Sequence, residues 1–172
     1  MKLLTFKGGI HPPYRKEYTN NKPLEKAKDP KVVYISMQQH IGAPAKPIVK
    51  LGDVVCVGQK IGEMQGFVSA NIHSSVSGTV IGIKDIDVPG GVSTCVIIEN
   101  DFKNTVHESV KPKGSLDSLT KEEIIESIKE AGIVGMGGAT FPTHVKISPP
   151  PDKKIDFVIL NGAECEPYLT AD

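Results

Sequence analysis

Short runs of β-branched and apolar residues, separated by glycine-containing turns, dominate residues 31–100. The clearest runs cover residues 32–35, 54–55, 76–83 and 92–98. Runs of this length and composition, bounded by turn residues, are typical of strands and too short for helices. The pattern therefore predicts an all-β module over residues 31–100.

The pattern changes after residue 118. Apolar residues then recur at the spacing of one helical face, at Ile124, Ile125, Ile128 and Ala131. Thr120 precedes this stretch and Glu123 lies three positions further on, which is the spacing of a capping box. We therefore expect an amphipathic helix whose isoleucines enter a core. A later apolar run, residues 157–160, predicts a buried strand, and the expected α/β unit is not completed within the chain.

The remaining stretches are polar or irregular. Residues 1–30 are rich in Pro, Gly, Lys and Asn, which predicts an extended segment that wraps the next domain. Residues 101–118 read as a linker. The expected fold class is α+β: a segment 1–30, an all-β domain 31–100, a linker 101–118, and the beginning of an α/β domain at 119–172.

The amino-acid composition of the chain argues against several classes of function. The 172 residues carry 20 basic and 20 acidic side chains, so the chain lacks the basic surplus that nucleic-acid binding requires. No apolar run approaches the roughly 20 residues that span a bilayer. The three cysteines, Cys56, Cys95 and Cys165, form no Cys-x-x-Cys pair, which argues against a disulfide framework and against a metal site within the chain. The five histidines show no metal-ligand spacing.

Two segments of the β module are related to each other. Residues 50–62 (KLGDVVCVGQKIG) and 72–83 (IHSSVSGTVIGI) each read as a hairpin with glycine turns. Together they resemble the biotinyl/lipoyl-type barrel-sandwich hybrid, whose carrier members present a modifiable lysine between the two halves. Residues 63–71 (EMQGFVSAN) contain no lysine. A biotin or lipoate carrier is therefore disfavoured, and a scaffold or docking module is expected.

A glycine-rich segment follows the predicted helix. Four glycines occupy residues 132–138, and this density permits backbone amides to approach a phosphate or a flat ring. The segment lacks the Gly-Lys-Ser/Thr ending of a Walker A loop, and it follows a helix where a Rossmann motif follows a strand. From these residues alone a structural turn and a ligand site are equally favoured.

A second polar segment, residues 161–167 (NGAECEP), follows the predicted strand. Ligands gather at the carboxyl ends of strands in open α/β sheets. If the segment is extended, Glu164 and Glu166 share one face and could accept hydrogen bonds from ribose hydroxyls or an amide group. A solvated loop explains the same residues, and without further information it is the preferred interpretation.

Taken together, the two segments resemble the paired flavin-site motifs of the NADH-oxidising flavoprotein subunit of respiratory complex I. They occur in the same order as those motifs and at nearly the same spacing. With residues 5–13 (TFKGGIHPP) and the lysine-free module, the whole chain resembles the RnfC family of the Rnf electron-transport complex. The resemblance implies an FMN site formed by Gly135, Gly137, Gly138, Ala139, Lys146, Asn161 and Glu164. It also implies that Phe141 and Glu166 contact NADH.

Several positions depart from the complex I pattern. An arginine of that pattern is replaced by Met136, an aspartate by Ala163, and glycines by Thr140, His144 and Cys165. These replacements resemble those in Rnf subunits, and they bear on nucleotide affinity and on the outline of the pocket.

The resemblance further implies a function. NAD(H) would exchange a hydride with FMN, and electrons would pass singly to [4Fe-4S] clusters bound outside residues 1–172, so this chain alone would be inactive. The expected setting is an ion-translocating complex on the cytoplasmic side of the cell membrane, where the chain is peripheral, contacts other Rnf subunits, and reaches ferredoxin through them. The alternative is a non-catalytic barrel-sandwich module that docks partner subunits.

Overall fold

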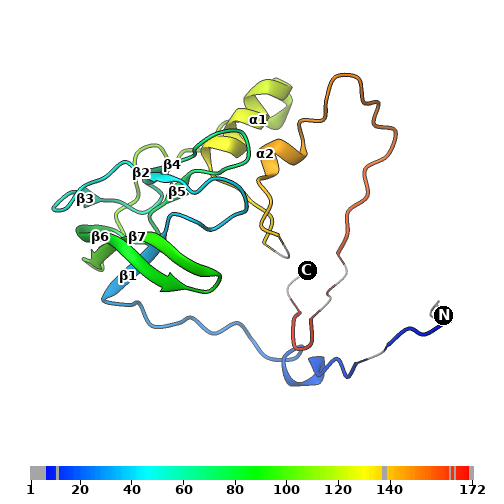
Figure 1. Ribbon diagram of the computed structural model, residues 1–172, viewed down its shortest axis with the longest axis horizontal. Coiled ribbons are helices and arrows are strands. Elements are labelled where there is room, and N and C mark those ends of the chain that lie inside the picture. The colour runs from blue at the N-terminus through cyan, green and yellow to red at the C-terminus, as the bar shows by residue number, and fades with distance from the viewer. Residues whose placement is uncertain (1–6, 11, 137–138, 163, 165, 171–172) are drawn as a thin grey trace. The chain divides into compact units, whose positions relative to one another are not determined.

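The computed structural model describes residues 7–10, 12–136, 139–162, 164 and 166–170. The chain divides into two compact units (Figure 1). The barrel unit comprises Asp29–Lys153, and the terminal unit comprises Met1–Lys28 together with Lys154–Asp172. No described helix is long and apolar enough to cross a membrane.

Two antiparallel sheets form the barrel unit. The larger has the order β1-β7-β6-β3 and the smaller the order β2-β4-β5. The strands of the larger sheet are β1 (Val32–Ser36), β7 (Gly91–Asn100), β6 (Gly78–Val88) and β3 (Val54–Val55). Those of the smaller sheet are β2 (Lys46–Pro47), β4 (Lys60–Glu63) and β5 (Ile72–His73). Figure 1 shows β6 and β7 as one long hairpin with β1 alongside β7.

The two related sequence segments pair with each other. The first strand of one, β3, pairs with the second strand of the other, β6, and β4 pairs with β5. The prediction that each segment forms a hairpin by itself is therefore wrong, because its two strands pair with strands of the other segment. This exchange places alternate side chains of both sheets in one shared interior. The interior is filled by aliphatic residues and one methionine, namely Ile35, Met37, Ala45, Val55, Ile61, Ile72, Val76, Val80, Val96 and Ile98. Two antiparallel sheets around one shared interior agree with the barrel-sandwich fold class expected from the sequence.

The strand predictions hold for each of the four runs. The third strand begins two residues later than its apolar run and extends five residues beyond it, to Val88. Its extension pairs with β7 from Lys84–Cys95 to Val88–Gly91, although many of its side chains are exposed. Apolar periodicity could not mark this part, because a solvent-exposed hairpin carries polar residues on both faces.

The predicted helix is α1 (Lys121–Glu130). Thr120 is its N-cap, and the reciprocal hydrogen bonds with Glu123 complete the capping box. Its isoleucines are half-buried, and the helix has no fully buried residue, so the expectation that they enter a core is wrong. The short helix α2 (Thr143–Lys146) packs against α1 in the barrel unit, and that contact shields only one side of α1.

Residues 101–113 lie along the barrel and are named the strap. The amide of Val57 donates to Thr105, and the amide of His107 donates back to Val57. A Cβ at Gly58 would lie 2.5 Å from a methyl carbon of Val110, so the strap is seated closely there. The 3-10 helix η2 (Leu116–Ser118) connects the strap to α1. The predicted linker is thus hydrogen-bonded to the barrel over part of its length.

In the terminal unit, the first and last segments of the chain contact each other. Its 3-10 helix η1 (Lys16–Tyr18) carries Tyr18, whose ring stacks on that of Tyr168 with 6.3 Å between the centroids. The amide of Tyr168 donates to the carbonyl of Tyr14. The buried strand expected at residues 157–160 is not formed: its four side chains are 83% to 92% exposed. No neighbouring strand is present among the described residues, and a strand needs a partner to satisfy its backbone groups.

Candidate functional site

The glycine-rich segment is a closed hairpin loop. Val134 and Pro142 form an antiparallel bridge. The amide of Gly135 donates to the carbonyl of Phe141 over 2.9 Å, and the amide of Thr143 donates to the carbonyl of Ile133 over 3.0 Å. Residues 133–135 and 141–143 therefore form two paired arms, named here the arms of the glycine loop, the first following α1 and the second leading into α2.

The entry to this loop is a helix cap. Gly132 has a φ of +66° and follows the last residues of α1. Its amide donates to the carbonyl of Lys129, and the amide of Ile133 donates to that of Ile128. These two bonds constitute a Schellman motif, for which a left-handed glycine is the usual requirement. Gly132 is therefore a structural glycine, in keeping with the turn interpretation for this one position.

The remaining predicted residues of this loop divide between the arms and the tip. Gly135 and Phe141 lie in the arms and are partly buried, whereas Ala139 lies in the tip and is exposed. Gly137 and Gly138 lie outside the described residues. Thr140, at a position where the complex I pattern has glycine, has a φ of +49°. A β-branched residue is seldom found in this left-handed region, so the tip keeps a glycine-like backbone without the glycine.

Lys146 occupies the last position of α2, immediately beyond the loop. Its side chain is exposed and forms no ion pair with any described residue. A flexible ammonium group at this place is suited to a phosphate, which it meets as a point charge.

The other predicted site residues belong to the terminal unit. Glu164 forms a 2.6 Å ion pair with Lys16, whose ammonium group also donates to the carbonyl of Leu169. The Lys16 and Glu164 side chains are 24% and 18% exposed, so the pair is partly shielded from water. Asn161 and Glu166 are exposed. The predicted residues therefore fall in two units, with Gly135, Ala139, Phe141 and Lys146 in one and the acidic segment in the other.

A cluster of polar residues ties the barrel to the end of α1. It lies where carrier domains have their modified tip, and residues 63–73 are named the tip segment. Lys60, beside it, forms a 2.7 Å ion pair with Glu130, which holds the pKa of that carboxyl below its usual range. The side chain of Asn71 donates to the carbonyl of Lys129 over 3.3 Å. The ring of His73 lies beside the backbone of Glu130.

The same tip segment contacts α2. His144 is 6% exposed, and its ring lies beside the backbone of Phe67. Burial lowers the pKa of His144, and the nearby Lys129 lowers it further, while the backbone of Phe67 and the carboxylate of Glu126 oppose this shift. The pKa of His73 is likewise lowered, chiefly by burial and then by Lys60. Both rings are consequently held neutral at the junction of barrel and helices.

These two histidines predict a loss of stability in mild acid. A lowered pKa means that the unfolded chain binds more protons, so the free energy of unfolding falls as the pH drops below about 6.5, the ordinary value for histidine. Urea unfolding of the chain at pH 7.5 and 5.5 measures the fall. We expect His144→Gln, which does not titrate, to reduce the pH dependence. Equal pH dependence in the wild type and the variant would contradict this.

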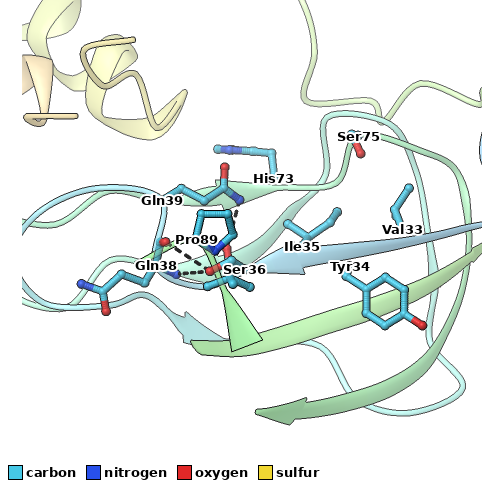
Figure 2. Close-up of a pocket in the computed structure, with 10 residues that line it drawn as sticks. Val33, Tyr34, Ile35, Ser36, Gln38, Gln39, His73, Ser75 and Pro89 are labelled. Atoms are coloured by element: carbon cyan, nitrogen blue, oxygen red, sulfur yellow. Dashed lines mark hydrogen bonds between the residues drawn. The ribbon is translucent and has the colours of Figure 1, made fainter. Parts of the chain in front are cut away.

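Two hollows in the barrel unit lie apart from the glycine loop. One, of about 610 Å³, is lined mainly by β1 and the turn of the β6–β7 hairpin. Figure 2 shows Gln38 and Gln39 hydrogen-bonded to Ser36 at its edge, with Pro89 drawn between the two glutamines. The second, of about 1070 Å³, lies between the strap, β4 and the end of α1. Neither is lined by residues 133–146, and the first has no Asp, Glu, Lys or Arg in its lining.

The sequence interpretation missed two groups of residues at these sites. Lys16 is 148 positions from Glu164, and no local pattern links them. Asn71 and His73 stand out in the sequence only as part of a lysine-free tip and as a scattered histidine. The absence of the carrier lysine was the available signal, because a tip that carries no cofactor is free to pack against another element.

Comparison with known proteins adds to this geometry. Residues 4–103 match the family described as the RnfC barrel sandwich hybrid domain, and residues 128–172 match the Nuo51 FMN-binding domain. The C subunit of the Na(+)-translocating ferredoxin:NAD(+) oxidoreductase complex of Acetobacterium woodii is 56% identical over 98% of the chain. The C subunit of the proton-translocating complex of Clostridium ljungdahlii is 53% identical over 99%. The chain spans 38% and 37% of the lengths of these two curated relatives.

Proposed function

The chain belongs to the RnfC family, the C subunits of Rnf-type electron-transport complexes, and from this membership we propose that it forms part of the NAD(H)-linked, FMN-binding end of such a complex. In the proposal it is a peripheral subunit at the cytoplasmic side of the membrane, where it contacts other Rnf subunits and reaches ferredoxin through them. The [4Fe-4S] clusters would be bound outside residues 1–172. The observation that carries the proposal is the match of residues 128–172 to an FMN-binding domain.

Each segment of the chain has its own role in this proposal. Residues 31–100 would be the scaffold, residues 101–118 the connection, and residues 119–172 the start of the flavin-binding domain. Residues 1–30 would wrap the domain that follows them. Within the terminal unit, the contacts of Lys16 with Glu164 and Leu169 are one means by which the first segment can order the acidic one.

The described residues of the glycine loop fit the phosphate end of FMN. The loop is closed at its base, so its tip presents a short backbone segment with the small side chain of Ala139. The exposed ammonium group of Lys146 lies one short helix further on. Backbone amides with one nearby cation are a common set of donors for phosphate. In the proposed site Gly135, Gly137, Gly138 and Ala139 would hold the cofactor through backbone, and Lys146 would neutralise its charge.

The other proposed contacts are polar or aromatic. Asn161 and Glu164 would complete the flavin pocket, and Phe141 and Glu166 would contact NADH. Bound FMN would supply the exchange between a two-electron donor and one-electron acceptors, which no amino-acid side chain provides. The protein's own part is to bind and orient both nucleotides.

A titration of FMN tests this proposal. The protein is the chain extended past Asp172 to the length of its relatives, and quenching of flavin fluorescence gives the dissociation constant. We expect Lys146→Met to raise this constant by about tenfold, because one charge-assisted contact to a phosphate is lost. Lys121→Met, an exposed lysine at the start of α1, is the matched control and should leave it unchanged.

The outcomes separate the two functions considered. Saturable binding that Gly137→Val with Gly138→Val abolishes in a folded protein would support the flavin site, since branched side chains would occupy the space of the ligand. Failure of the folded, extended protein to bind FMN would overturn the proposal and leave a non-catalytic docking module. Unchanged affinity in Lys146→Met would remove only that residue from the site.

A further inference from the structure

The tip segment contacts the element on each side of the glycine loop. On the entry side, the side chain of Asn71 donates to the carbonyl of Lys129 at the end of α1, and the ring of His73 lies beside the backbone of Glu130. The same Lys129 carbonyl accepts from the amide of Gly132, so Asn71 adds a bond from the barrel to the Schellman motif that closes the helix. A Cβ on Gly132 would lie 2.1 Å from the carbonyl oxygen of Asn71, so these two residues are in close contact, beside a cavity of about 130 Å³ that Asn71, Gly132 and Val134 help to line.

On the exit side, the contact involves α2. The buried ring of His144 lies beside the backbone of Phe67 in the tip segment. Pro142, at the end of the second arm, is fully buried. Both ends of the glycine loop are thus attached to one rigid support, although the tip of a carrier domain would stand free.

Among the attached residues, Asn71 joins the most elements. It is 3% exposed, its oxygen accepts from the amide of Met64, and its nitrogen donates to Lys129. The carboxylate of Glu130 lies 3.5 Å from the same nitrogen. One buried side-chain amide therefore connects the tip segment to the end of α1.

We propose that Asn71 is a positioning residue for the glycine loop: it fixes the end of α1 on the barrel so that the loop is held ready for FMN without Asn71 touching the cofactor. The proposal rests on the proposed flavin function. Binding to a loop that is already fixed avoids the entropy lost in ordering a mobile one. Loss of the contact between Asn71 and the end of α1 should therefore weaken the binding of FMN.

The informative substitution is Asn71→Asp. The carboxylate can still accept from Met64 but can no longer donate to Lys129, and it places a negative charge beside Glu130 and at the negative end of the helix. Loss of one hydrogen bond of this kind weakens the attachment by about 1 kcal/mol. We expect the dissociation constant for FMN to rise by about fivefold, as that energy implies.

The barrel offers a matched control in Asn100. It is 5% exposed, its oxygen accepts from the amide of Phe102, and its nitrogen donates to the carbonyl of Pro30. Asn100→Asp therefore breaks an equivalent bond in the same unit, between two segments that do not adjoin the loop. Its cost in stability should be comparable, and its effect on FMN affinity should be absent.

Two measurements on the chain extended past Asp172 test the positioning role of Asn71. The first is the dissociation constant for FMN in the wild type, Asn71→Asp and Asn100→Asp. The second is hydrogen exchange of the amides of Gly135 and Thr143 without FMN, which needs no ligand. We expect Asn71→Asp alone to raise both the constant and the exchange rates.

Each result has a definite meaning. Equal FMN affinity in the two variants, or equal exchange of the loop amides, would overturn the role of Asn71 while leaving the flavin site intact. If the wild type fails to bind FMN, the proposed function fails, and faster exchange confined to Asn71→Asp would then show a positioning contact without a flavin role, which also overturns this inference as stated.

Discussion

Replacing Gly132 with valine should destabilise the barrel unit by about 3 to 4 kcal/mol. The residue has a φ of +66°, which is costly for any side chain, and a Cβ would lie 2.1 Å from the carbonyl oxygen of Asn71. Backbone atoms cannot move aside as the end of a flexible side chain can. The substitution would also distort the Schellman motif that closes α1. Urea unfolding of the 172-residue chain, followed by circular dichroism, gives the change.

Gly66→Val separates the cost of a side chain at a positive φ from the cost of the close contact with Asn71. Gly66 has a φ of +84°, but no atom lies within 4 Å of the place where its Cβ would be. The free energy of unfolding of Gly66→Val should therefore fall only by the cost of the left-handed backbone, about 1 to 2 kcal/mol. If both variants lost the same stability, the close approach of Asn71 to Gly132 would not be the cause. A larger loss in Gly66→Val would contradict the structure directly.

Local patterns were sufficient for most elements of the barrel unit. The four apolar runs became strands because alternate side chains fill one interior, as at Ile35, Val80 and Ile98. The N-terminus of α1 was predicted from two residues, Thr120 and Glu123, because a capping box is a bond within one helical turn. Such features depend on neighbours in sequence, and one sequence is enough to recognise them.

Features that depend on distant contacts could not be predicted in this way. The apolar run at residues 157–160 has the composition of a buried strand, yet burial requires a partner that the described residues do not provide. The isoleucines of α1 have helical spacing, but spacing cannot state how much of their surface a neighbour covers. The pair of Lys16 and Glu164 joins opposite ends of the chain.

In the candidate site, too, local features could be recognised from the sequence and features that depend on distant contacts could not. Glycine density alone could not separate structural positions from ligand positions, and the structure assigns Gly132 to a helix cap. The resemblance to a flavoprotein family supplied the role of the remaining glycines, and that role stays a prediction. Thr140 has a positive φ where the family pattern has glycine, so the backbone conformation can be kept when the residue type is not.

The barrel core should control the stability of the platform on which the glycine loop rests. Ile98 in β7 is fully buried and pairs with Val33 on one side and Val80 on the other. We expect Ile98→Ala to lower the free energy of unfolding by about 3 to 4 kcal/mol, through lost burial and the cavity left behind. Urea unfolding measures this, with the slope against urea checked for constancy.

Ile81 supplies the comparison for that prediction. It lies in β6, in the same sheet, but is 44% exposed, so Ile81→Ala removes the same atoms and should cost less than about 1 kcal/mol. Because the tip segment is anchored through β4 and β5, Ile98→Ala should also speed hydrogen exchange at Gly135 and Thr143, whereas Ile81→Ala should not. Unchanged exchange in Ile98→Ala would mean that the loop is held by α1 and α2 alone and that the barrel contributes no support.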